Sequence, residues 1–169
     1  MELRSVEAIV QSLNAGGVRY LIAGGMAVVA HGYLRLTMDL DLILDLNDEN
    51  LRAAVRALSS LGYRPLAPVP FEQFIDAQVR DQWVREKHLT VFSLFSSIHE
   101  KTAIDLFVEA PLDFTAAYAV AVWKEVAPGL SAPFVSRDDL LEMKKQAGRP
   151  KDLLDIEQLR KLEKEKPNG

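Results

Sequence analysis

Two aspartates spaced two residues apart, Asp39 and Asp41, interrupt a run of leucine and isoleucine, and this run constrains the fold most. Side chains on a strand alternate between its faces, so both carboxylates point to one face and Leu40, Leu42 and Leu44 to the other. Two carboxylates side by side on a largely buried strand repel each other and lose hydration, which a cation between them relieves. Because hard cations such as Mg²⁺ prefer carboxylate oxygens, the pattern predicts a divalent metal site.

A solvent-facing edge strand, or pairing with Arg35, would also accommodate Asp39 and Asp41. The flanking methionine, leucine and isoleucine residues argue instead for a central strand, where unpaired acids are costly. A calcium-binding EF-hand is excluded, because the glycine and the terminal glutamate of its loop are absent at the required offsets. A metal site on a buried strand is therefore the favoured interpretation.

A glycine pair, Gly24-Gly25, lies between an apolar segment expected to form a strand over 18–23 and a short helix expected over 26–31. Such a turn offers free backbone N–H groups at a helix start, which suits a phosphate, although tight packing alone also explains many of these turns. Neither GxGxxG nor GxxxxGK[ST] is present, which excludes a dinucleotide fingerprint and a P-loop.

A third acid, Asp105, interrupts the apolar segment 102–108, which we expect to be a later strand. Ala103, Asp105 and Phe107 share one face of that strand by the same alternation. The remaining predicted strands are 38–44, 89–95, 119–126 and 132–135, with 63–70 as a loop or a short edge strand. The predicted helices are 3–13, one starting at Asn47, one over 71–83, 113–118, 137–147 capped by Ser136, and 151–164.

Length and composition set the broad class of the protein. At 169 residues with 49% hydrophobic content, we expect one domain over 1–169, with a core about 1–110 and C-terminal strands and helices about 111–164. The chain contains no cysteine and no signal-peptide pattern, so a cytoplasmic setting is expected. No apolar run reaches the roughly 20 residues of a membrane span, and a net charge of -4 argues against a broad nucleic-acid footprint.

The order of four features resembles the nucleotidyltransferase superfamily typified by DNA polymerase β. These features are Gly-Gly, a short helix, Asp-x-Asp on the next strand and a lone Asp on a later strand. The strings GGMAVVAHGYLRLTMDLDLIL and LLEMKKQAGRPKDLLDIEQL resemble a narrower set, the small prokaryotic enzymes related to AbiEii-type toxins and to antibiotic-modifying nucleotidyltransferases. The resemblance covers 20–45, 102–108 and 136–160. The superfamily usually has Gly-Ser where this chain has Gly24-Gly25, which removes one hydroxyl contact to phosphate.

The resemblance implies transfer of a nucleoside monophosphate from an NTP to an acceptor hydroxyl, with pyrophosphate leaving. It implies that Asp39 and Asp41 hold two Mg²⁺ ions, with Mn²⁺ as a substitute, and that Asp105 ligates the metal nearest the acceptor and helps deprotonate it. Gly24 and Gly25 would supply backbone donors to the phosphates. The expected fold is α/β: a nucleotidyltransferase-like mixed sheet of roughly four to six strands, with helices on one side and a helical C-terminus.

Cationic residues occur before the acid strand and near the C-terminus. Arg35, followed by Thr37, is assigned to nucleotide binding; it either meets the triphosphate or neutralises Asp39. On the helix after Ser136, helical geometry places Lys144 on the inward side, where a triphosphate or an acid partner would account for it. The alternative is a lysine whose amine extends back to water. Lys144 is accordingly added to the three aspartates as a candidate catalytic residue.

Asp152 and Asp155 flank the inward side of the last helix, and we expect them to support the site without reacting. They would complement the helix N-terminus or pair with Arg149 and Lys151, and so position Lys144 or Arg149. Arg149 is assigned to the same supporting group.

The acceptor is left open by the sequence: a tRNA end, a protein hydroxyl or a small antibiotic needs the same donor machinery. The short chain leaves little room for an acceptor domain, so a partner chain (an antitoxin in the toxin branch) or a homo-oligomer would complete the pocket. A non-catalytic nucleotide- or partner-binding relative of the same fold is the alternative, and retention of all three acids counts against it. A DxD glycosyltransferase is disfavoured, because this DxD lies in an apolar strand rather than in a loop.

Overall fold

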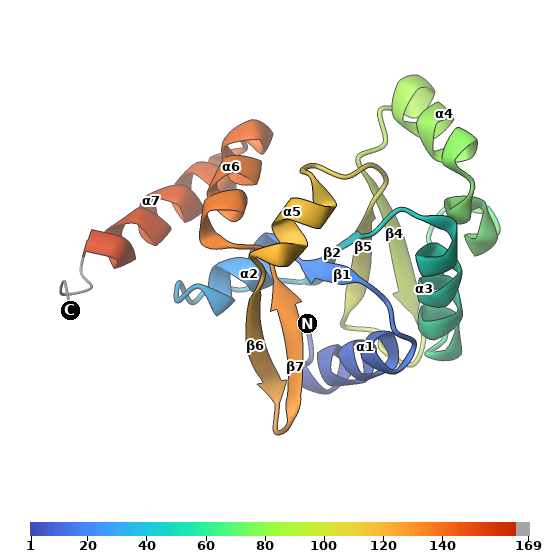
Figure 1. The fold of residues 1–169 in the computed structure, drawn as a ribbon, viewed down its shortest axis with the longest axis horizontal. Helices are drawn as coiled ribbons and strands as arrows, with labels where there is room; N and C mark the ends of the chain where they lie inside the picture. The colour runs from blue at the N-terminus through green and yellow to red at the C-terminus, as the bar shows by residue number, and fades with distance from the viewer. Residues whose placement is uncertain (165–169) are drawn as a thin grey trace.

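A computed structural model describes residues 1–164 and contains one mixed sheet with helices on both of its faces (Figure 1). The strands are β1 (Tyr20–Ile22), β2 (Asp39–Leu44), β3 (Tyr63–Pro65), β4 (Val91–Ser96), β5 (Ala103–Phe107), β6 (Val122–Ala127) and β7 (Leu130–Phe134). The helices are α1 (Leu3–Ala15), α2 (Gly24–Ala30), α3 (Asp48–Ser60), the 3₁₀ helix η1 (Phe71–Ile75), α4 (Ala77–Lys87), α5 (Phe114–Ala119), α6 (Arg137–Ala147) and α7 (Pro150–Lys164).

The strand order β3-β4-β5-β2-β1-β7-β6 places the acid strand β2 at the centre of the sheet. β2 pairs antiparallel with β1 and parallel with β5. The sheet has seven strands, so the expectation of four to six was too low; the segment after Gly62 adds β3 as a short edge strand, and β6 and β7 extend the other side. The central position of β2 agrees with its apolar flanks.

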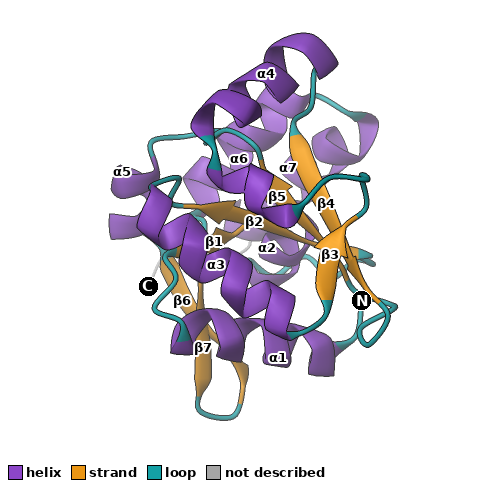
Figure 2. Ribbon diagram, turned by 90° about the vertical axis from the view of Figure 1, so that its right-hand side faces the viewer, coloured by secondary structure: helices purple, strands orange, loops and turns teal. Residues whose placement is uncertain are grey.

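Helices cover both faces of the sheet, so the expectation of helices on one side was wrong. α1 and α3 contact each other and lie over one face, as Figure 2 shows. α2 contacts β2 and α6, and α6 contacts α7. Gly24 of α2 lies against the Asp41 carboxylate, which places this group on the face that carries the acids. Within residues 1–164, no helix combines the length and the apolar character that crossing a bilayer requires.

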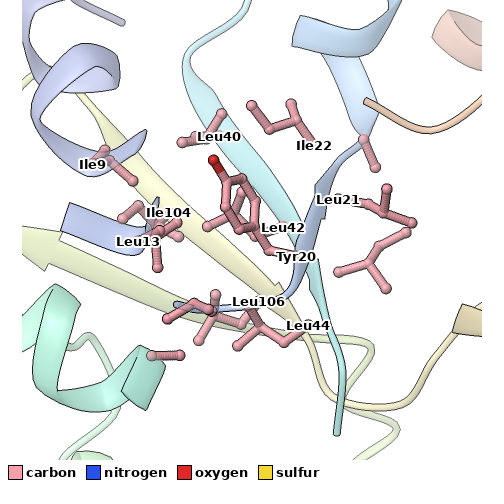
Figure 3. Packing of buried hydrophobic residues seen from close by; sticks show 14 of the residues in the cluster. Ile9, Leu13, Tyr20, Leu21, Ile22, Leu40, Leu42, Leu44, Ile104 and Leu106 are labelled. Carbon is pink, nitrogen blue, oxygen red and sulfur yellow. The ribbon is translucent and has the colours of Figure 1, made fainter. Parts of the chain in front are cut away.

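The apolar face of β2 is buried in the core. Leu40, Leu42 and Leu44 are at most 1% exposed. Figure 3 shows them beside side chains of α1, β1 and β5: Ile9, Leu13, Tyr20, Ile22, Ile104 and Leu106. A slip of one residue would turn these leucines to the opposite face, so their burial fixes the direction in which Asp39 and Asp41 point.

Several local predictions can be compared with the structure. Asn47 and Ser136 are the N-caps of α3 and α6, accepting from Asn50 N at 2.9 Å and from Asp139 N at 3.1 Å, as expected. The single helix predicted over 71–83 is instead η1 followed by α4. The break occurs because the Asp76 carboxylate accepts hydrogen bonds from the first backbone N–H groups of α4 and starts a new helix there.

Candidate functional site

Three carboxylates meet on one face of the sheet. Asp39 and Asp41 occupy alternate positions of β2, and Asp105 lies on the neighbouring parallel strand β5. Asp41 and Asp105 are direct Cα partners across the two strands, and Asp39 is the partner of Ala103. All three aspartates are half-buried. Period-two alternation predicted the shared face of Asp39 and Asp41, and the pairing of β2 with β5 brings Asp105 beside them.

Burial and the two neighbouring acids perturb Asp41. Burial, followed by the charges of Asp39 and Asp105, raises the pKa of Asp41 from 3.8 to about 6. The backbone N–H of Gly25 and the charge of Lys144 oppose that rise and do not cancel it. Asp41 therefore carries its negative charge at an energetic cost, which a cation at this position would remove.

The donor set suits a hard divalent cation such as Mg²⁺, which takes carboxylate oxygens from a few side chains and completes its shell with water or phosphate. In the part of the chain that the structure describes, no group of three or more His, Cys, Asp or Glu side chains already surrounds a single ion position. Any ion bound by Asp39, Asp41 and Asp105 would accordingly need additional ligands from a substrate.

The glycine pair packs directly against the acid strand and its approach. Gly24 and Gly25 are the first two residues of α2, where a turn before the helix was expected. Gly24 has φ +58°, and a Cβ at this position would lie 1.7 Å from Asp41 Oδ2. A Cβ on Gly25 would lie 2.5 Å from Thr37 Oγ1 and 3.0 Å from Arg35 Nη2. Both positions require glycine, because any side chain would displace a residue of the site.

A cleft of about 670 Å³ opens over the three carboxylates of Asp39, Asp41 and Asp105, which we call the acid row. It is lined by nearly all of the residues that the sequence singled out: Gly24, Gly25, Arg35, Thr37, Asp39, Asp41, Asp105, Lys144, Arg149 and Asp152. Asp155 is the exception; it is buried behind Arg35 and Lys144 and holds them both. The structure thus gathers residues from both ends of the chain around one opening.

Buried ion pairs organise the cationic side of the cleft. Lys144 Nζ lies 3.1 Å from Asp152 Oδ1 and 2.7 Å from Asp155 Oδ2, and Lys144 is only 5% exposed. Arg35 Nε lies 2.9 Å from the other oxygen of Asp155. The amine of Lys144 therefore does not extend to water, and acid partners account for its inward position.

Arg149 extends the ion-pair chain at the end of α6. Its Nε lies 2.6 Å from Asp152 Oδ2, so the charges alternate in the order Arg35, Asp155, Lys144, Asp152, Arg149. Burial acts to raise the pKa of Asp152, but hydrogen bonds from Arg149 and Lys144 outweigh it and lower that pKa. The hydrogen bond to Asp152 raises the pKa of Arg149. Both shifts favour the charged forms of Asp152 and Arg149.

The structure shows what Arg35 and Thr37 contact. Arg35 pairs with Asp155, so the suggestion that it neutralises Asp39 was wrong. The reason is that α7 brings the buried Asp155 to within 2.9 Å of Arg35 Nε, whereas no ion pair joins Arg35 to Asp39 among the described residues. Thr37 Oγ1 donates to the backbone carbonyl of Asp39 at 3.2 Å and so anchors the start of β2.

Sequence reasoning missed Ser93 on β4. Its hydroxyl donates to Asp105 Oδ1 at 2.5 Å, and Ser93 is the direct cross-strand partner of Asp105. The signal was present, because Ser93 lies between buried Phe92 and Leu94 and therefore faces the other side of the sheet. It could be used only once the register between β4 and β5 was known.

Comparison with known proteins supports the fold. The sequence matches no protein-family model and no curated protein. The structure is similar to the crystal structure of a lincosamide antibiotic adenylyltransferase, LnuA, with lincomycin bound. The TM-score is 0.56 over 93% of this chain and 95% of that chain, at 14% sequence identity. The predicted mixed α/β nucleotidyltransferase-like fold is thereby confirmed.

Proposed function

We propose that this chain is a divalent-metal-dependent nucleotidyltransferase, which moves a nucleoside monophosphate from an NTP to an acceptor hydroxyl. The observation that carries this proposal is a single cleft with two oppositely charged sides. Asp39, Asp41 and Asp105 lie on the sheet, and Arg35, Lys144 and Arg149 line the same opening. A triphosphate with bound cations presents both charges and complements both sides.

The carboxylates of Asp39, Asp41 and Asp105 would hold the metal ions. When bound, divalent ions in such a site stabilise charge on the attacking and leaving oxygens of an in-line displacement. In the proposed reaction a bond forms between the acceptor oxygen and the α-phosphorus. The bond from that phosphorus to the bridging oxygen breaks, and the electron pair leaves with pyrophosphate. Asp105 would take the proton of the acceptor hydroxyl.

The cationic side would bind the triphosphate without large rearrangement. Asp152 and Asp155 are 0% and 1% exposed, and each holds two cations at once. Side chains locked by buried partners lose little entropy when a ligand binds. Lys144 would contact phosphate oxygens, while the two aspartates position it and Arg149. Backbone N–H groups of Gly24 and Gly25 would add donors beside Asp41.

We infer a small hydroxylated molecule as the acceptor. The structural neighbour LnuA is an antibiotic adenylyltransferase, and this chain aligns with nearly all of that protein, so no additional acceptor domain distinguishes the two. Toxin-type transfer to a tRNA end or a protein hydroxyl, with an antitoxin or a second copy as partner, would use the same donor site. A test of the function therefore includes all three acceptor classes.

The experiment incubates the protein with each labelled NTP and Mg²⁺, in the presence of tRNA, a protein pool or aminoglycoside and lincosamide antibiotics. Asp41→Asn removes one acid of the row, and Asp138→Asn, at an exposed aspartate outside the cleft, is the matched control. We expect labelled product from the wild type and from Asp138→Asn only. NTP binding without any product would instead favour a non-catalytic binding protein, and absence of Mg²⁺-dependent nucleotide affinity would exclude both functions.

A further inference from the structure

Ser93 and Asp105 are joined by a short hydrogen bond within the sheet. Ser93 Oγ donates to Asp105 Oδ1 at 2.5 Å, from the strand β4 that pairs antiparallel with β5. This distance is at the short end of the range for a hydroxyl donor and an oxygen acceptor. The bond therefore ties Oδ1 of Asp105 to the neighbouring strand.

The bond uses one oxygen of Asp105 and leaves the other open. Among the described residues, no hydrogen bond or ion pair involves Asp105 Oδ2, and Asp105 lines the cleft. Ser93 has a single hydroxyl proton, and that proton is directed to Oδ1. Rotation of the carboxylate about its Cβ–Cγ bond would break this hydrogen bond, so Ser93 restricts which oxygen faces the cleft.

Asp105 differs in this respect from the two acids of β2. Asp41 is held by contact with Gly24 and by the backbone N–H of Gly25. No side-chain hydroxyl donates to the carboxylate of Asp39 or Asp41 within residues 1–164, since Thr37 donates to the Asp39 backbone carbonyl. Of the three acids, Asp105 is thus the one whose carboxylate accepts a hydrogen bond from a side-chain hydroxyl within residues 1–164.

We infer that Ser93 is a positioning residue, which orients the Asp105 carboxylate so that Oδ2 serves the metal ion and the acceptor proton. This inference rests on the proposed nucleotidyltransferase function. Hydrogen-bonding partners behind metal ligands commonly alter metal affinity or activity 10–100-fold when they are removed. Ser93 itself touches neither the substrate nor the metal in this role.

The test compares Ser93→Ala and Ser93→Cys with Ser93→Thr. Alanine removes the donor, cysteine keeps a similar volume with a weak donor, and threonine keeps the hydroxyl on a residue that suits a strand. Ser97→Ala, at an exposed serine in the neighbouring turn, is the control. Binding of Mn²⁺ in the presence of a non-hydrolysable NTP analogue is measured by electron paramagnetic resonance, and kcat and KM are measured for pyrophosphate release.

We expect Ser93→Ala and Ser93→Cys to lower Mn²⁺ affinity or kcat about 10–100-fold with little change in the KM for NTP. Ser93→Thr should stay within a few fold of the wild type, as should Ser97→Ala. The inference would be overturned if Ser93→Cys stayed within twofold of the wild type in both Mn²⁺ affinity and kcat. This outcome is decisive even if Ser93→Ala fails to fold. Mn²⁺ binding that depends on Ser93 without any transfer would uphold the inference and refute the proposed function. A wild type that binds no Mn²⁺ would refute both.

Discussion

Asp41 and Asp105 face each other across the parallel pairing of β2 with β5, and their mutual repulsion is built into the register of the sheet. The apolar residues on the opposite face of both strands are fully buried, so the strands cannot shift to separate the two charges. Repulsion between these carboxylates therefore lowers the stability of the folded protein, by an amount that depends on pH and on bound cations.

The first prediction concerns pH. Because burial and neighbouring acids raise the pKa of Asp41 from 3.8 to about 6, the folded state favours its protonated form. The contribution of Asp41 to the free energy of unfolding is therefore fully present below pH 4 and is lost as pH rises through 6. The difference between the two limits is about 3 kcal/mol. Asp41→Asn should therefore be the more stable protein at pH 7 without metal, and its advantage should shrink toward pH 4. Urea denaturation at several pH values measures this; an advantage that stays constant with pH would contradict it.

The second prediction concerns Gly24. Replacement by alanine should displace Asp41, because the new Cβ would lie 1.7 Å from its carboxylate oxygen. Gly129→Ala is a matched control, since Gly129 also has a positive φ, +74°, but no atom lies within 4 Å of its added Cβ. Both variants incur roughly 1–2 kcal/mol of backbone strain. We expect only Gly24→Ala to lose Mg²⁺-dependent nucleotide affinity in calorimetric titrations; equal affinities in the two variants would argue against the close contact.

The third prediction concerns Asp155, which holds Arg35 and Lys144 together in a buried position. Asp155→Ala leaves both cations without this partner and should destabilise the protein by roughly 3–5 kcal/mol. Lys101→Ala removes a surface pair with Glu2 and should cost less than about 1 kcal/mol. Chemical denaturation compares the free energies of unfolding of the two variants. A similar small decrease for both would show that the buried ion pairs contribute little to stability.

The fourth prediction separates two adjacent lysines on α6. Lys144 is buried and lines the cleft, whereas Lys145 is exposed and pairs with Glu142. Lys144→Met should weaken NTP binding by about tenfold or more, because charge-assisted hydrogen bonds to phosphate are lost. Lys145→Met should change the dissociation constant by less than about twofold. Fluorescence titration with a labelled NTP distinguishes them, and equal losses would place the triphosphate elsewhere.

The shared face of Asp39 and Asp41 was predictable because it depends on local rules. Alternation along β2 determines that Asp39 and Asp41 share a face, and the apolar neighbours determine which face is buried. The N-caps Asn47 and Ser136 likewise follow from side chains that bond within three residues. Each of these features involves only a short stretch of chain, so its physical cause can be read directly from neighbouring residues.

The partners of the cations could not be predicted, because they depend on contacts between distant segments. Arg35 and Asp155 are separated by 120 positions, and nothing near Arg35 in the sequence distinguishes Asp155 from Asp39 as its partner. The role of Ser93 similarly depends on the register of β4 against β5, which loop closure and core packing set together. Only the tertiary structure could reveal either contact.

The opposite walls of the cleft come from distant parts of the chain, which matters during translation. The acids lie on β2 and β5, whereas Lys144, Arg149, Asp152 and Asp155 belong to α6, α7 and the residues between them. A nascent polypeptide that has emerged only as far as β7 carries the three carboxylates without these later residues. N-terminal segments generally fold first during synthesis, so Lys144 and Arg149 would join Arg35 at the cleft only after the acid strands have formed. A competent cleft can therefore assemble only after α6 and α7 have been synthesised.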